Sequence, residues 1–149
     1  MTKIYLHSRY ENIFKQFEFT RTAIMNAGDI AEVYWDGDAN KSWYPTYDSV
    51  YAGQINCLVS VINQGSGTQV YGASNVEEDN ILFEYVSGIS TIAHIHQYFK
   101  HADTNMNGTW SFSVNPVNQG IKITWTAPSG ANNTTFKMRC LAKVNEIKL

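Results

Sequence analysis

The sequence predicts an all-β protein, an antiparallel β-sandwich that is jelly-roll-like and carries a short N-terminal arm. Aromatic residues reach 13%, nine of them Tyr, against only three Pro. Such a composition favours strands over helices. Several segments alternate between apolar and polar residues, which is the period of a strand buried on one face. The links between these segments are rich in Asn, Gly, Pro and Ser, the residues that form turns.

The C-terminal third shows this alternation most clearly, in "GTWSFSVNP", "GIKITWTAP" and "TFKMRCLAKV". Because apolar side chains recur at every second position, three successive antiparallel strands are predicted. The residues expected to face the core are Trp110, Phe112 and Val114, then Ile121, Ile123 and Trp125, then Phe136, Met138, Cys140, Ala142 and Val144.

Further strands are predicted upstream. "GQINCLVSVINQ" is the strongest, with Ile55, Cys57, Val59 and Val61 on one face. "AGDIAEVYWDGD" reads as a shorter strand, and "GSGTQVYGAS" as a turn with a short strand. "NILFEYVSG" and "STIAHIHQYFKHA" read as two strands around an "SGIS" turn. Seven to nine strands separated by turns are typical of a sandwich or jelly roll.

The segment "YENIFKQFEFTRTAIM" fits either a helical turn or a strand, and periodicity does not decide between them at this length. We expect residues 1–15 to form an arm or anchoring segment outside a sandwich domain at 16–149. The residues expected to mediate assembly are Ile4, Tyr5, Ile13, Phe14 and Phe17.

Composition excludes several classes of protein. A chain of 149 residues suits one domain. Its net charge of −2, with 16% charged residues, does not indicate a basic surface for nucleic acid. No apolar run approaches the roughly 20 residues of a membrane span. Since the start "MTKIYLHSRYENIF" lacks the features of a signal peptide, we expect synthesis in a cytoplasm and no membrane insertion.

The two cysteines, Cys57 and Cys140, are too few for a disulfide scaffold or a cysteine-only zinc site. Each lies in an alternating apolar segment, where a buried free thiol behaves as a small hydrophobe. Free thiols are therefore expected, and a bridge stays open if the two strands are neighbours.

Three of the four histidines lie in "AHIHQYFKHA". On a regular strand His94 and His96 would project from the same face and could share a metal. No Asp, Glu or Cys in the motif completes the ligand set, so a polar strand face is the favoured interpretation and no cofactor is expected. A symmetric trimer would change this, because it would gather six imidazoles around one axis.

The aromatic segment "KSWYPTYDSVY" has two interpretations. Trp43, Tyr44 and Tyr47 would bind a ligand or a host surface if they are exposed on a loop, because flat rings stack well at low entropic cost. Alternatively, these rings close one end of the sandwich or a subunit interface.

No motif argues for catalysis, so the chain is not expected to be an enzyme. Asp36 and Asp38 flank a Gly in a segment that fits a plain turn better than a calcium loop. Glu77 and Glu78 are expected on a solvated loop. The sequence holds neither a Gly-x-Ser-x-Gly elbow nor a phosphate-binding loop. A polysaccharide hydrolase or lyase would need these four acidic residues to supply a carboxylate pair.

The order of the segments "FTRTAIMNAGDIAEVYW", "INCLVSVINQGSGTQVYGAS" and "AHIHQYFKHADTNMNGTWSFSVNPVNQGIKITWTAPSGANNTTFKMRCLAKV" resembles small all-β domains of tailed-bacteriophage virion proteins. Such domains recur at the C-termini of tail fibres and in head fibres or capsid decoration proteins. The resemblance covers about residues 19 to 144 and transfers no catalytic residue.

This resemblance implies a structural protein of the virion, made in the host cytoplasm. It implies a homotrimer whose N-terminal segment docks on another capsid or tail protein and whose loops face the host surface. Three copies of a weak surface would bind with avidity. The alternative function is a lectin-like carbohydrate-binding module, which would bind glycan through the aromatic segment.

Overall fold

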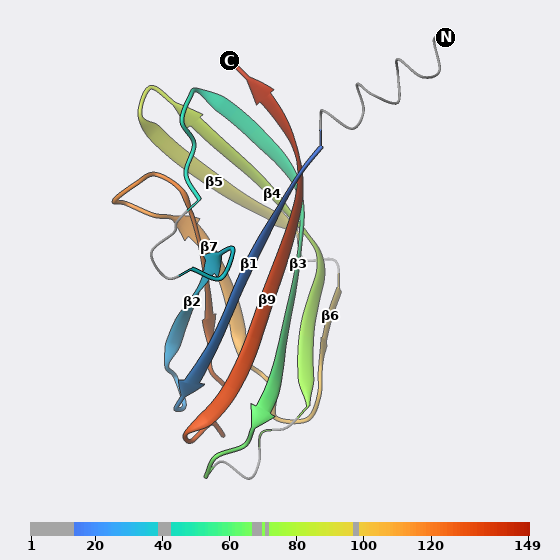
Figure 1. Cartoon of the computed structure of the whole chain (residues 1–149). Coiled ribbons are helices and arrows are strands. Elements are labelled where there is room, and N and C mark those ends of the chain that lie inside the picture. The colour runs from blue at the N-terminus through green and yellow to red at the C-terminus, as the bar shows by residue number, and fades with distance from the viewer. Residues whose placement is uncertain (1–13, 39–42, 67–69, 71, 97–98) are drawn as a thin grey trace.

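The computed structural model describes residues 14–38, 43–66, 70, 72–96 and 99–149 (Figure 1). At 14, 77–79, 94–96 and 99–100 it describes the backbone alone. Every helix or strand in this part of the chain is a β-strand. The strands are β1 (Phe14–Met25), β2 (Ile30–Trp35), β3 (Ser49–Asn63), β4 (Ala73–Val86), β5 (Ile89–His96), β6 (Phe99–Ala102), β7 (Thr109–Val114), β8 (Ile121–Thr126) and β9 (Thr134–Lys148).

All strand pairs are antiparallel, and their order is β5-β4-β3-β9-β1-β2-β8-β7, with β6 also pairing with β4. The long strands β3 and β9 pair along nearly their whole length, from Ser49–Lys148 to Asn63–Thr135. β1 continues this sheet through twelve pairs with β9 but joins β2 through only two, Phe19–Trp35 and Thr20–Tyr34. The strands β2, β8 and β7 therefore swing away and lie opposite the longer strands (Figure 1).

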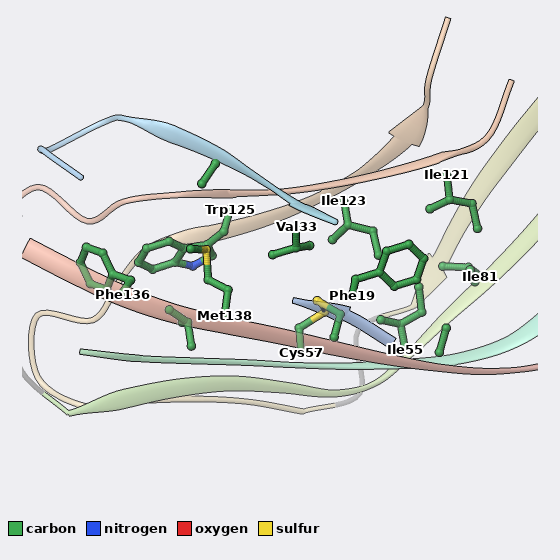
Figure 2. Packing of buried hydrophobic residues seen from close by; sticks show 14 of the residues in the cluster. Phe19, Val33, Ile55, Cys57, Ile81, Ile121, Ile123, Trp125, Phe136 and Met138 are labelled. Atoms are coloured by element: carbon green, nitrogen blue, oxygen red, sulfur yellow. Dashed lines mark hydrogen bonds between the residues drawn. The ribbon is translucent and has the colours of Figure 1, made fainter. Parts of the chain in front are cut away.

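The core lies between these two layers. Alternate residues of β3 and β9 point inward, among them Ile55, Phe136 and Met138, all fully buried. Figure 2 shows these side chains facing Ile123 and Trp125 of β8. Burying an aliphatic or aromatic side chain of this size contributes roughly 1.5–3 kcal/mol, so the inward-facing residues of β3, β9 and β8 contribute strongly to folding.

β5 and β7, the two edge strands of the sheet, are in contact with each other. Ser90 at the start of β5 donates its backbone N–H to Gln119 Oε1 (2.8 Å) and its hydroxyl to the Gln119 carbonyl (2.6 Å). Gln119 lies in the turn between β7 and β8. The sandwich is thus nearly closed, and this contact covers part of the two edges of the sheet, where unpaired backbone groups would otherwise be open to other chains.

The all-β antiparallel architecture and the nine strands confirm the fold predicted from the alternating segments. The ambiguous segment forms β1, a strand from its first described residue, because it can pair with β9 throughout. The described part of the chain contains no helix with the length and apolar character needed to span a bilayer.

Two boundaries were predicted wrongly. Glu77 and Glu78 lie inside β4, which runs unbroken from Ala73 to Val86, and not on a solvated loop. β4 accommodates its acidic segment through a register shift against β3, between the pairs that include Ile55 and Cys57. "STIAHIHQYFKHA" forms two strands, β5 and β6, which pair with successive parts of β4.

Candidate functional site

Trp43 is buried, with only 6% of its surface exposed. Its ring lies 5.1 Å from Phe17, 5.1 Å from Tyr51 and 5.5 Å from Phe83, measured between centroids. These tilted and edge-on arrangements are the favoured geometries of aromatic pairs. The prediction that Trp43 contacts a ligand or a host surface is therefore wrong. The structure shows the alternative, in which the Trp43 ring is a plug that closes one end of the sandwich.

The carbonyl of Trp43 lies against Gly120, at the end of the turn between β7 and β8. A Cβ at Gly120 would come within 1.8 Å of this oxygen, so only glycine allows the contact. The aromatic segment is thus held on the sandwich by a backbone contact as well as by ring contacts. The sequence signal that indicated this was the Trp itself, since Trp is highly buried on average.

The two neighbouring tyrosines differ in their surroundings. Tyr44 is 54% exposed and is the one member of the predicted binding set that faces outward. Tyr47 is partly buried, and its hydroxyl donates to Glu146 Oε1 at 3.1 Å. The Lys148 ammonium lies 4.6 Å from the centre of the Tyr47 ring, a cation–π contact. The aromatic segment therefore does not present a three-ring surface.

Sequence reasoning missed the most highly connected polar group of this end, Glu146. Its side chain is 8% exposed, yet Lys15 Nζ lies 3.2 Å from Oε1. Tyr51, its register partner on β3, also hydrogen-bonds to it. A buried carboxylate is tolerated when paired and hydrogen-bonded, and three partners meet that need. The alternation of β9 could have indicated it, because Glu146 continues the inward series that ends in Val144.

The pKa values in this group follow from its burial. Burial raises the pKa of the Glu146 carboxyl, but hydrogen bonds from Tyr51, Lys15 and Tyr47 outweigh it, so this pKa is lowered overall. Burial raises the pKa of the Tyr51 hydroxyl far above its usual value, reinforced by the negative charge of Glu146. At neutral pH Glu146 is an anion, and its bonds to Lys15, Tyr47 and Tyr51 hold β1, β3 and β9 together.

Among the predicted assembly residues, only Phe14 and Phe17 fall in the described part of the chain. Phe14 opens β1 opposite Asn145 of β9, so the strand begins before the predicted domain boundary. Phe17 packs against the core and against the ring of Trp43, so it belongs to the sandwich, and its role in assembly stays a prediction. Ile4, Tyr5 and Ile13 lie outside the described residues.

The predicted histidine pair lies on β5, but the register there is irregular. His94 pairs with Ile81 and His96 with Asn80, so three residues of β5 span two of β4. The regular alternation on which a shared metal depended is therefore interrupted. The side chains of both histidines lie outside those described. No group of three or more His, Cys, Asp or Glu side chains that could hold a metal occurs among the described residues.

The four carboxylates considered for hydrolysis lie on two separate elements of the fold. Asp36 and Asp38 lie in a turn after β2, where Gly37 and Asp38 donate their backbone N–H groups to Tyr34 and Trp35. This confirms the plain turn. Glu77 and Glu78 belong to β4, and their side chains are outside those described.

Apolar side chains gather on the outer face of the sheet at the end that carries Glu146. The register places Ile147 beside Val50 and Val86 beside Ile89, and Leu149 follows on the same side. Ile147, Ile89 and Leu149 are 62%, 68% and 69% exposed. We call these five residues the outer apolar patch. Figure 1 shows the C-terminus, the start of β3 and the β4–β5 hairpin together at this end.

A hollow lies on the same outer face, across the middle of β3 and β9 and the first part of β4. Its volume is about 300 Å³. Amide, guanidinium and apolar side chains line it, from Asn56, Leu58, Asn75, Arg139 and Leu141. Arg139 is held by Glu18 of β1 through two contacts, of 3.1 and 3.3 Å. The hollow thus combines hydrogen-bonding side chains, of which Arg139 is held by an ion pair, with two leucines.

Comparison of the chain with protein-family models, with curated proteins and with solved structures found no match. The function proposed below therefore rests on the fold and on the outer face of the sheet.

Proposed function

We propose that this protein is a structural subunit of a bacteriophage particle, a fibre or capsid decoration subunit that assembles as a homotrimer. The observation that supports the proposal best is the outer apolar patch. A cluster of exposed aliphatic residues at one end of a sheet marks a surface for protein association. The resemblance of the sequence segments to small all-β domains of phage virion proteins suggests a phage particle as the place of assembly.

The position of the patch suits assembly. It lies on the rigid sheet, at the end where the Glu146 hydrogen bonds and the Trp43 plug fix β1, β3 and β9. A preformed surface on fixed strands binds a partner without the entropic cost of ordering a loop. Closed rings of identical subunits are a common solution for such a surface, and they repeat any weak contact three times.

Solution mass tests the proposal. By light scattering coupled to size exclusion, we expect a mass near three times 16.8 kDa. Ile147→Asp and Ile89→Asp should each yield monomers with unchanged circular dichroism. Ile24→Asp is the matched control, since Ile24 is 71% exposed and pairs with Thr135, at the opposite end of β9 from Ile147. A monomeric wild type, or trimers in both patch variants, would refute assembly through this surface.

The hollow at Arg139 favours a second function, glycan binding by a lectin-like surface. Sugars present hydroxyl groups and apolar C–H faces, which match the asparagines, the arginine and the leucines that line it. A glycan array should show binding that Arg139→Ala removes and Tyr44→Ala leaves intact. Equal binding by wild type and Arg139→Ala would exclude the hollow as a sugar site.

A further inference from the structure

The only two cysteines of the chain, Cys57 and Cys140, meet in the core. They are register partners on β3 and β9, 83 residues apart in sequence, with their Sγ atoms 2.7 Å apart. Both are free thiols and both are buried, with 1% and 0% of their surface exposed. Figure 2 shows Cys57 among the apolar side chains between the two layers.

We propose that this thiol pair is an oxidation site, at which a peroxide converts Cys57 and Cys140 into an intramolecular disulfide. Directly paired residues of antiparallel strands have Cα atoms roughly 4.5–5.5 Å apart, within the range that a disulfide spans. The side chains of such a pair point to the same face of the sheet. The bond therefore needs a rotation about the side chains and no separation or approach of the strands.

The chemistry consumes one peroxide molecule per bond. One thiol attacks hydrogen peroxide, which gives a sulfenic acid and one water molecule. The second thiol then attacks the sulfenic sulfur, the S–S bond forms, and the hydroxyl leaves as a second water molecule. Two thiols are oxidised by two electrons in all, and the peroxide is reduced to two waters.

Burial selects the oxidant. Removal from water raises the pKa of the Cys140 thiol, reinforced by its contact with Cys57, so the reactive thiolate is scarce. A bulky disulfide reagent cannot reach sulfur atoms that are covered by both layers. Hydrogen peroxide is small and uncharged, so it can reach the pair through local openings of the sheet.

The bond would join the two central strands of the fold. Closing so long a loop restricts the unfolded chain, and the expected gain is a rise of roughly 10 °C in melting temperature. The inference is independent of the proposed function. It would suit a particle that is made in a reducing cytoplasm and then released, because the bond would form after assembly.

Intact mass after peroxide treatment tests the proposal. The folded full-length protein is treated with hydrogen peroxide, unfolded in urea, and alkylated with iodoacetamide. We expect a monomer lighter by two hydrogens that takes up no label, a raised melting temperature, and full reversal by dithiothreitol. Cys57→Ala and Cys140→Ala should show neither the mass change nor the rise.

Treatment of the wild type in urea serves as the check that the oxidant works. If the wild type treated with peroxide while folded still takes up two labels, the proposal is wrong. A disulfide found only between chains, or oxidation that stops at sulfinic acid, would also overturn it.

Discussion

Lys15 and Glu146 join the first and last described strands, with Nζ 3.2 Å from Oε1, although the Glu146 side chain is only 8% exposed. The pair stands at the N-terminal end of β1 and the C-terminal end of β9, where strands usually fray. Tyr47 and Tyr51 bring β3 and the segment before it to the same carboxylate. One anion thus holds three chain segments together beneath the outer apolar patch.

Glu146→Gln should lower the free energy of unfolding by about 2 kcal/mol at pH 7, because hydrogen bonds to a charged group are worth roughly 1.5–3 kcal/mol. Glu18→Gln is the matched control. Glu18 forms its ion pair with Arg139 at an exposed site, and such pairs contribute about 0–1 kcal/mol. Urea unfolding of both variants measures the difference, and equal losses would contradict the role assigned to Glu146.

The same carboxylate predicts an acid dependence. The pKa of Glu146 is lowered in the folded state, so the unfolded chain binds its proton first as the pH falls. Its contribution is complete above the ordinary glutamic acid pKa of about 4.3 and is lost as the pH falls through the lowered folded value. Melting temperatures of wild type and Glu146→Gln should therefore converge as the pH falls below about 4.3. A constant gap over this range would show that the carboxyl does not titrate as described.

Trp43→Ala should cost about 3–5 kcal/mol, because it empties the centre of the aromatic plug formed with Phe17, Tyr51 and Phe83. Tyr44→Ala should change stability by less than about 0.5 kcal/mol, since Tyr44 is 54% exposed. Denaturant midpoints measure both. A mild loss in Trp43→Ala would mean that the plug does not stabilise this end of the sandwich.

The sequence predicted those parts of the fold in which one face of a strand alternates cleanly. Phe136, Met138 and Cys140 are buried as expected, and Lys137 and Arg139 are exposed, because the period of β9 fixes its register against the core. Tertiary pairing decided the rest. The Phe-rich segment became a strand because β9 offers it a partner, and nothing local distinguishes that from a helical turn.

The candidate site was harder to predict, because it depends on which residues meet across the sheet. Aromatic clustering in the sequence indicated an important segment, but it could not say that Trp43 points inward while Tyr44 points outward. The meeting of Cys57 with Cys140, and of Lys15 with Glu146, depends on the order β3-β9-β1. That order joins strands distant in sequence, and no spacing along the chain encodes it.

Gly120→Ala should destabilise the protein by about 2–3 kcal/mol, as overpacking does in well-packed sites. A Cβ there would lie 1.8 Å from the Trp43 carbonyl, so the segment that carries the plug must move. Gly88→Ala is the control, because its Cβ meets open space and only its φ of +81° is strained, at about 1 kcal/mol. The loss in Gly120→Ala should come with a shift of Trp fluorescence, which Gly88→Ala should lack. An unshifted spectrum would contradict the contact.

The near closure of the sandwich predicts the behaviour of its edge. Ser90→Ala removes the hydroxyl that donates to the Gln119 carbonyl and leaves that acceptor unpaired in a position where Ser90 is 8% exposed. The expected cost is about 1–2 kcal/mol. The backbone bond from Ser90 to Gln119 Oε1 remains, so β5 should loosen without detaching.

Hydrogen exchange locates this effect. Amides at the start of β5 should exchange faster in Ser90→Ala, while those of β3 and β9 keep their protection, because local openings need not unfold the central strands. Ser111→Ala, at an exposed position on β7, should leave exchange unchanged. A loosened β5 exposes backbone groups of its edge to other chains, so the variant should also aggregate sooner on heating. Uniformly faster exchange in all strands would mean that the Ser90–Gln119 contact stabilises the whole fold and does not guard one edge.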